Sequence, residues 1–449
     1  MRNEYGRDLT KGKVFSNLIV LALPIFLVLL LTMGYQIINS IWIGNMLGKD
    51  ALASATVSLS ILSLLISVAT GSTLAISILI SQTFGKKDHE MVKKIVDNSI
   101  YFFIIVSVII TVVFIIGSNF FLKVMGASDE ILGMASTYLR LSMVGFLAIY
   151  LFDVVNAILN GVGDVKTPLK ILVLSTVINA VLDPILISRF GLKGAAFASL
   201  ISQVAALIAG IIYINKKGDL LSIKIKRFTF DKEIIIKLVK IGFPSLIQQC
   251  LLPLSSLFIT ALVASYGSES IAAFGAAGKI DYFAIIPAMA IGNAVSIMAG
   301  QNIGAGLYDR VKEIFKNAIK INLLINLIIA LVVFFMPKIL LRMFAADPHV
   351  LNIGANYLKI VCFGYILFAI SFVTNGIING SGKTIITMLI SFLSLCIIRV
   401  PIAIFLSHNG FGLNGIWIAI LISYAVTSVN SSLYYLLGKW RKVALDAAA

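Results

Sequence analysis

Charged residues are scarce in this sequence. Lys, Arg, Asp and Glu make up 12% of its 449 residues, whereas hydrophobic residues make up 59%. A soluble globular protein is about one-quarter charged, so the composition excludes an ordinary water-soluble fold. The mean hydropathy of +1.02 agrees with this conclusion. We therefore expect the lipid bilayer to be the main surroundings of the chain.

Histidine and cysteine are also rare, with three of each in the sequence. The histidines lie in three separate loops, so their spacing predicts no metal cluster. The cysteines all fall inside apolar stretches, where a thiol usually packs as a small hydrophobic group. We expect neither a disulfide nor a structural metal from these residues, which are His89, His349, His408, Cys250, Cys362 and Cys396.

Sequence signatures of catalysis are lacking. The string GSGKT at 380–384 resembles part of a phosphate-binding loop, but that motif needs a glycine five positions before Gly382, where Ile377 stands. The string aligns with GVGDV in the first half of the chain, so we interpret both as tight turns. We find no nucleophile elbow, no paired-histidine motif and no dinucleotide fingerprint. We predict that the protein is not an enzyme and needs no cofactor.

Long apolar stretches are what the sequence does contain. A bilayer core about 30 Å thick needs roughly 20 mainly apolar residues per helix, and helices satisfy their own backbone hydrogen bonds in lipid. We predict twelve membrane-spanning helices. Their approximate bounds are 14–43, 52–80, 98–122, 135–159, 168–188, 195–215, 235–265, 271–298, 317–340, 351–378, 385–406 and 413–437.

Most positive charges lie on one side of this topology. Counted alternately from the N-terminus, the segments on one side hold 26 Lys and Arg residues and the loops on the other side hold six. By the positive-inside rule, we predict a multi-pass protein of the plasma membrane with both termini in the cytoplasm. The net charge of +16 then reflects topology and contact with anionic lipid headgroups, and we expect no nucleic-acid partner.

The second half of the chain repeats the first at a nearly constant offset. Gln82 and Gly85 match Gln301 and Gly304 at an offset of 219 residues. Six helices per half give both halves the same orientation, which is typical of parallel-repeat transporters. The other matches are Pro24 with Pro244, Tyr138 with Tyr357, Asn156 with Asn375, Asn160–Gly163 with Asn379–Gly382, Pro184 with Pro401, and GLKG at 191–194 with GLNG at 412–415.

The repeat predicts the fold class. We expect an all-α integral membrane protein with twelve helices in two six-helix lobes, related by a pseudo-two-fold axis along the membrane normal. The first lobe covers residues 1–215 and the second lobe covers residues 235–449. A basic cytoplasmic connector, residues 216–234, joins them.

Few ionisable residues fall inside the apolar spans. Each costs roughly 2.5–3.5 kcal/mol on insertion scales, so each is a candidate functional residue. Asp183 is the strongest candidate, because Asn179 lies one turn before it on the same helical face. Pro184 follows directly and leaves the carbonyl of Ala180 without its helical donor. These oxygen atoms predict a cation site, which could hold Na⁺ at Asp183 and Asn179. The alternative is a structural hydrogen bond in a kinked helix.

Two further carboxylates have open roles. Asp153 is either a second coupling acid or a buried partner of polar groups such as Gln36 and Asn39. Asp281, with its neighbour Tyr282, is either a contact for substrate charge or part of a structural ion pair. We interpret Arg399 as structural or as the partner of such an acid.

The motifs INAVLDPILI at 178–187, NGVGDVKTP at 160–168 and GQNIGAG at 300–306, together with the repeat of six helices, resemble the MATE family of multidrug and toxic-compound extrusion transporters. The resemblance covers nearly the whole chain. It implies two six-helix lobes around a V-shaped cleft, and export of amphipathic, often cationic compounds against an inward flow of H⁺ or Na⁺.

The resemblance also implies site residues. The amide and acid of the family's first-lobe cation site match Asn179 and Asp183, and a hydroxyl matches Ser199 or Ser202. Family members often carry an aspartate in the first helix, where this sequence has Asn39. The acid that one branch carries in the seventh helix is absent, and Gln248 and Gln249 occupy this region. We include both glutamines among the expected substrate-binding residues.

We predict a cation-coupled efflux antiporter that works as a monomer by alternating access. The alternative is a flippase for lipid-linked oligosaccharide or another lipid-like substrate. A flippase should line its cleft with several cationic residues to hold a pyrophosphate, whereas helices 1, 2, 7 and 8 offer only Lys279. An integral membrane enzyme would need clustered histidines or acids near one interface, and none is found in the sequence.

Overall fold

The computed structural model describes residues 2–3, 5–222, 230–344 and 346–441. Residues 223–229 of the predicted connector lie outside this part of the chain. The first half contains the strands β1 (Arg2–Asn3) and β2 (Gly6–Arg7), which pair antiparallel. Its helices are α1 (Val14–Leu47), α2 (Lys49–Gly85), α3 (His89–Ile116), α4 (Ser118–Val124), α5 (Asp129–Gly161), α6 (Lys166–Phe190) and α7 (Leu192–Lys216).

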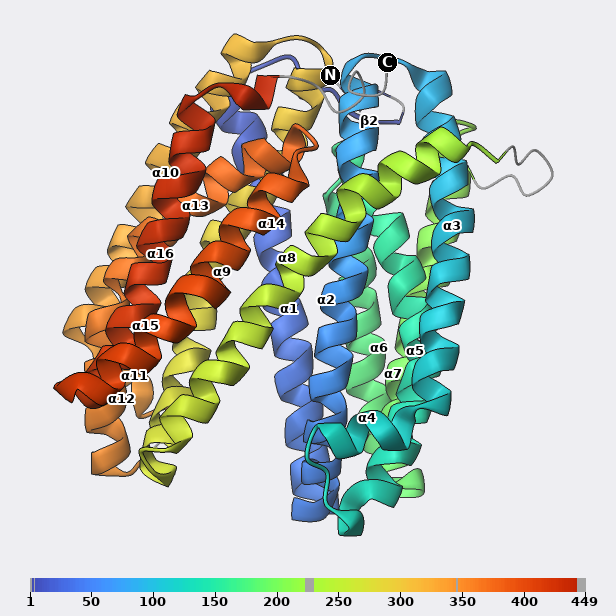
Figure 1. Ribbon diagram of the computed structural model, residues 1–449. Coiled ribbons are helices and arrows are strands. Elements are labelled where there is room, and N and C mark those ends of the chain that lie inside the picture. Colours follow the sequence, from blue (N-terminus) through green and yellow to red (C-terminus); the bar gives the residue numbers. More distant parts are fainter. Residues whose placement is uncertain (1, 4, 223–229, 345, 442–449) are drawn as a thin grey trace. The chain divides into compact units, whose positions relative to one another are not determined.

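All regular elements among the described residues of the second half are helices (Figure 1). Two π-helical turns, Leu393–Ile398 and Ser407–Phe411, flank α15, and a short 3₁₀ turn covers Lys439–Arg441. The α-helices are α8 (Lys232–Ala264), α9 (Ser268–Gly304), α10 (Tyr308–Phe335), α11 (Pro337–Leu341), α12 (Pro348–Val361), α13 (Phe363–Gly380), α14 (Thr384–Phe392), α15 (Arg399–Leu406) and α16 (Gly412–Leu436).

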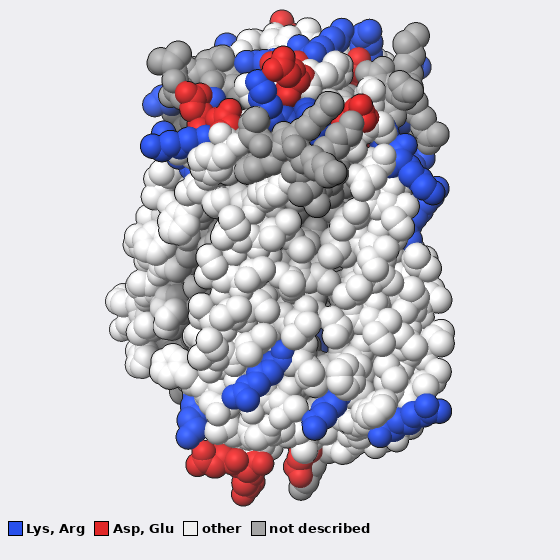
Figure 2. Space-filling view, turned by 90° about the vertical axis from the view of Figure 1, so that its right-hand side faces the viewer, with Lys and Arg blue, Asp and Glu red and all other residues white. Residues whose placement is uncertain are grey.

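Twelve membrane crossings are consistent with these helices, as the sequence predicts. Among the described residues, 11 helical stretches are long and apolar enough to cross a bilayer. The last of them, residues 384–436, contains non-helical backbone at Asn409 and Gly410, so it divides into two crossings. Figure 2 shows, on the face in view, a broad band free of charged side chains between two charged ends. The protein is therefore a multi-pass membrane protein.

The helices are longer than the apolar stretches that predict them. The second helix, predicted at 52–80, runs from Lys49 to Gly85 in the structure. Hydropathy detects only the lipid-facing part of a helix, and polar turns continue it beyond the hydrocarbon. The predicted span 98–122 differs more, because a break at Gly117 separates α3 from the short α4.

The chain packs as two compact units. Unit 1 comprises Met1–Asp8 and Leu27–Leu246, and unit 2 comprises Leu9–Phe26 and Ile247–Ala449. The first parts of α1 and α8 therefore pack with the unit that holds the other repeat half. In both helices a proline, Pro24 or Pro244, stands two residues before the exchange.

The internal repeat is visible inside each unit. In unit 1, α5 packs against α2, α3 and α7; in unit 2, α13 packs against α9, α10 and α16. These helices correspond through the offset found in the sequence, so the two units share one packing pattern.

The matched motifs form matched turns. Gly163 and Gly382 have φ values of 81° and 83°, and their amides donate to Asn160 and Asn379 over 2.9 and 2.7 Å. A positive φ at a helix C-terminus favours glycine. The string GSGKT thus ends one helix and begins the next, as expected for a tight turn.

Candidate functional site

Asp183 lies inside α6 and is fully buried, with 0% of its surface exposed. Asn179, one helical turn earlier, donates from its side-chain nitrogen to Asp183 Oδ1 over 3.3 Å. Asp183 Oδ2 has no hydrogen-bond partner among the described residues. A buried carboxylate oxygen without a donor carries uncompensated charge density, which a cation or a proton would neutralise.

Helices α1 and α7 bring further oxygen atoms to this region of unit 1. The Tyr35 hydroxyl donates to Ser199 Oγ over 2.9 Å, and it lies within electrostatic range of Asp183. Ser202 is fully buried one turn after Ser199 and donates to the Ser199 carbonyl over 2.9 Å. Asn39, one turn after Tyr35, is 4% exposed, and its Oδ1 has no partner among the described residues.

Tyr138 of α5 lies beside these groups. Its side chain is 2% exposed, and it packs in one buried cluster with Ile43 of α1, Ile187 of α6 and Ala195 of α7. Tyr35 and Asp183 lie within electrostatic range of its hydroxyl. Four helices, α1, α5, α6 and α7, therefore supply one polar cluster in the interior of unit 1. We call it the Asp183 cluster, and it consists of Tyr35, Asn39, Tyr138, Asn179, Asp183, Ser199 and Ser202.

The Asp183 cluster suits a monovalent cation. Its donor atoms are carboxylate, amide and hydroxyl oxygens, which are the ligands of hard cations, and it contains one carboxylate. Within the described ranges, no group of three or more His, Cys, Asp or Glu side chains could hold a metal ion. The cluster therefore has the chemistry to exchange H⁺ or Na⁺ at a single charged group.

The structure does not bring Gln36 and Asp153 into this cluster. Gln36 is exposed on α1. Asp153 lies 15 residues after Tyr138 on α5, which corresponds to about 22 Å along a helix. It lies instead within electrostatic range of Tyr150, and its Oδ2 is buried without a partner among the described residues.

Asp281 forms a different kind of site in unit 2. It is 7% exposed on α9, and its two carboxylate oxygens accept hydrogen bonds from the hydroxyls of Tyr357 and Tyr365, on α12 and α13. Tyr357 packs edge-on against Trp417, with ring centroids 4.7 Å apart. Both oxygens of Asp281 thus have donors, whereas Asp183 has one free oxygen.

Arg399 lies beside this aromatic group without a direct contact to Asp281. Its Nε donates to Ser423 Oγ over 2.8 Å, and its guanidinium lies 5.1 Å from the centre of the Tyr424 ring. No contact of the remaining substrate candidates with the Asp281 carboxylate is described. Tyr282 is 43% exposed and Gln249 is exposed, while Gln248 Oε1 accepts from Thr387 over 3.0 Å.

Sequence reasoning missed the tyrosines of both sites. Tyr35 and Gln36 lie four and three residues before Asn39 on α1, but Tyr35 is half-buried and Gln36 is exposed. Tyr138 and Tyr357 were matched by the repeat at offset 219, which was the available signal. A neutral phenol carries no insertion penalty as large as that of a carboxylate, so the cost of placing it in lipid does not mark it as functional.

These observations define a class of protein. A twelve-crossing helical membrane protein with an internal repeat and one buried, half-satisfied carboxylate in its first unit has the features of a secondary transporter.

Comparison with known proteins gives the family. The MatE family model matches residues 24–185 and again 244–405, once in each repeat. The chain belongs to the MATE family of transporters.

Similar proteins span nearly the whole chain. The probable multidrug resistance protein YpnP of Bacillus subtilis is 31% identical over 440 residues, covering 98% of each chain. The multidrug export protein MepA of Staphylococcus saprophyticus is 26% identical, covering 96% of each. In fold, the chain is similar to a MOP superfamily transporter from Pyrococcus furiosus, with a TM-score of 0.91, 23% identity and coverage of 99% and 100%.

Proposed function

We propose that this protein exports amphipathic, mainly cationic compounds across the plasma membrane in exchange for H⁺ or Na⁺. The observation that carries the proposal is the free, buried oxygen of Asp183 within a cluster of amide and hydroxyl groups. Names of relatives such as YpnP and MepA, which describe multidrug resistance and export, support the substrate class. The protein acts as a monomer with both termini in the cytoplasm and needs no cofactor beyond the coupling ion.

The coupling step is a change of charge at Asp183. An ionised carboxylate is poorly solvated in the interior of a membrane protein, so binding of H⁺ or Na⁺ lowers its free energy. Cation binding from outside therefore stabilises a conformation in which Asp183 is closed off from bulk water. Cation release stabilises a conformation in which Asp183 is accessible to bulk water. Alternation between them, with substrate and cation bound in turn, gives antiport by population shift.

The substrate role stays with the groups around Asp281. A cationic substrate would compete for the Asp281 carboxylate with the phenol donors of Tyr357 and Tyr365, and aromatic faces attract organic cations. Tyr282, Gln248 and Gln249 would supply adaptable polar contacts, in line with a largely apolar site for varied amphiphiles.

Transport into proteoliposomes tests the proposal. A pH gradient and a Na⁺ gradient are imposed separately, and accumulation of a panel of cationic dyes is followed. Asp183→Asn should abolish gradient-driven transport, because asparagine keeps the shape of the side chain and cannot change its charge. Asp129→Asn is the matched control, since Asp129 is 90% exposed at a helix end. Wild-type rates in the Asp183→Asn protein would refute coupling at this site.

A further inference from the structure

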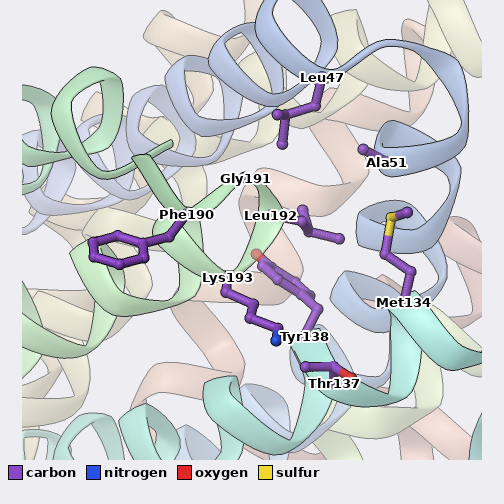
Figure 3. Close-up of a pocket in the computed structure, with 9 residues that line it drawn as sticks. All are labelled: Leu47, Ala51, Met134, Thr137, Tyr138, Phe190, Gly191, Leu192 and Lys193. Atoms are coloured by element: carbon purple, nitrogen blue, oxygen red, sulfur yellow. The ribbon is translucent and has the colours of Figure 1, made fainter. Parts of the chain in front are cut away.

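A hollow of about 300 Å³ lies at one end of unit 1 (Figure 3). It lies between the end of α1, the beginnings of α2 and α5, and the link between α6 and α7, through residues such as Leu47, Ala51 and Leu192. Most of its lining is apolar. The polar groups are the hydroxyls of Thr137 and Tyr138 and the ammonium of Lys193.

Tyr138 belongs both to this hollow and to the Asp183 cluster. Its ring lines the hollow and reaches in Figure 3 toward the segment Gly191–Leu192, while Asp183 lies within electrostatic range of its hydroxyl. The remaining residues of the Asp183 cluster are absent from the lining. Ile187, one helical turn after Asp183 on α6, packs in the same buried apolar group as Tyr138 and Leu192, so the hollow lies close to the buried carboxylate. Tyr138 is the one side chain of the described lining that also belongs to the Asp183 cluster.

We propose that this hollow is the route by which the coupling cation reaches Asp183, with Tyr138 as its gate. The inference rests on the proposed function and on the predicted orientation, which places this end of α1, α2, α5 and α6 outside the cell. A carboxylate with no exposed surface needs a hydrated path to bulk water. A liquid water molecule occupies about 30 Å³, so the hollow has room for several around a small monovalent cation.

Lys193 acts as an electrostatic filter at the mouth of this route. It lines the hollow and its side chain is exposed to solvent. Its positive charge raises the free energy of any cation in the mouth, and the effect declines as salt screens it. Lys193 is thus a positioning residue that sets the external cation concentration needed for transport, without contacting the ion at Asp183.

Charge reversal tests the filter. Lys193→Glu should lower the external cation concentration for half-maximal transport by roughly threefold to tenfold at low ionic strength, and the difference should shrink toward 1 M salt. Lys123→Glu is the matched control, because Lys123 is exposed at α4 and is absent from the lining. Equal effects of both reversals, or no effect of either, would refute the role of Lys193.

Blocking the hollow tests the route. Thr137→Cys is placed in a protein whose three native cysteines are replaced by alanine, and an impermeant, bulky thiol reagent is added from outside. Modification should slow gradient-driven dye transport at least tenfold, while the Kd for dye in detergent stays unchanged. The same modification of Asp129→Cys, at the same end of unit 1, should leave the transport rate unchanged. Parallel pH-gradient and Na⁺-gradient assays identify which cation uses the route.

Two failures are distinguishable in this design. If the fully modified Thr137→Cys protein transports at its unmodified rate, and Asp183→Asn still abolishes transport, the route is wrong and the coupling site stands. If the unmodified protein shows no gradient-driven transport, or Asp183→Asn transports like the wild type, the proposed function itself fails.

Discussion

The two buried carboxylates with assigned neighbours differ in how their oxygens are satisfied. Asp183 receives one hydrogen bond, from Asn179, and keeps one free oxygen. Asp281 accepts one tyrosine hydroxyl on each oxygen. A free oxygen is available to a small cation, whereas a satisfied carboxylate also anchors the helices that donate to it. We therefore expect the two acids to respond differently to substitution.

The tyrosines around Asp281 should stabilise unit 2. Tyr357→Phe or Tyr365→Phe removes a donor from a buried carboxylate, which should lower stability by about 1–2 kcal/mol, toward the low end in a membrane protein. Thermal unfolding of the purified protein in detergent would measure the loss. Tyr282→Phe is the control, because Tyr282 is 43% exposed and no hydrogen bond of its hydroxyl is described. Equal stability of all three variants would contradict an anchoring role.

At the scale of elements, the internal repeat is easiest to see in the turns between helices, where glycines recur at matched positions. Gly191 and Gly412 have φ values of 58° and 51° and begin matched helices. Gly194 and Gly415 lie three residues later, and a Cβ at either would collide with backbone of the preceding helix, near Leu186 or Leu406. Glycines at these places keep adjacent crossings close, which explains why they persist at one register in both halves.

The turn at 160–164 also contains an ionic anchor. Asp164 accepts hydrogen bonds from the Tyr213 hydroxyl over 3.0 Å and from Lys217. Burial alone would raise the pKa of Asp164, but the hydrogen bonds and charge of Lys217, with the hydroxyls of Tyr213 and Thr167, outweigh it and hold the pKa below its ordinary value. The anchor joins the turn between α5 and α6 to the end of α7.

A depressed folded-state pKa has a defined pH dependence. The stabilisation from Asp164 should be complete above the unfolded-state pKa of about 3.9 and should be lost as the pH falls through the folded-state pKa. Asp164→Asn should therefore lower the Tm at pH 7 and have little effect well below pH 4. Asp129→Asn is the control, since that carboxylate is 90% exposed and pairs with Lys123 over 3.4 Å. A Tm difference independent of pH would contradict the ionic interpretation.

Hydropathy located the helices because each must be apolar over the width of the bilayer, whatever it packs against. It could not locate breaks such as the one at Cys362 between α12 and α13, because such a break leaves the residues around it just as apolar. Within the candidate site, the sequence singled out Asp183, because a carboxylate is costly in lipid. The sequence did not single out Tyr35 and Tyr138, because their place in the candidate site depends on which helices pack together.

At the scale of the whole molecule, the repeat halves and the packing units are not the same. Residues 9–26 pack with unit 2 and residues 247–264 of α8 pack there as well, whereas residues 232–246 pack with unit 1. The repeat is a similarity between two stretches of sequence, whereas the packing units depend on which helix faces contact one another. Only the first of these can be read from a periodic match, which paired Pro24 with Pro244 but did not show that α1 and α8 pass from one unit to the other beside them.

The charge distribution predicts the orientation of the whole molecule, which is the subject of the last prediction. The predicted cytoplasmic segments hold 26 Lys and Arg residues against six in the opposite loops, and such an imbalance fixes insertion. In a protein whose native cysteines are replaced by alanine, Lys232→Cys, in the connector, should react with an impermeant reagent only from the cytoplasmic side. Asp129→Cys should react only from outside, because an odd number of crossings, α1, α2 and α3, separates it from the N-terminus. Labelling of Lys232→Cys from outside in intact cells would contradict the predicted orientation. The hollow beside Tyr138 would then lie on the cytoplasmic side.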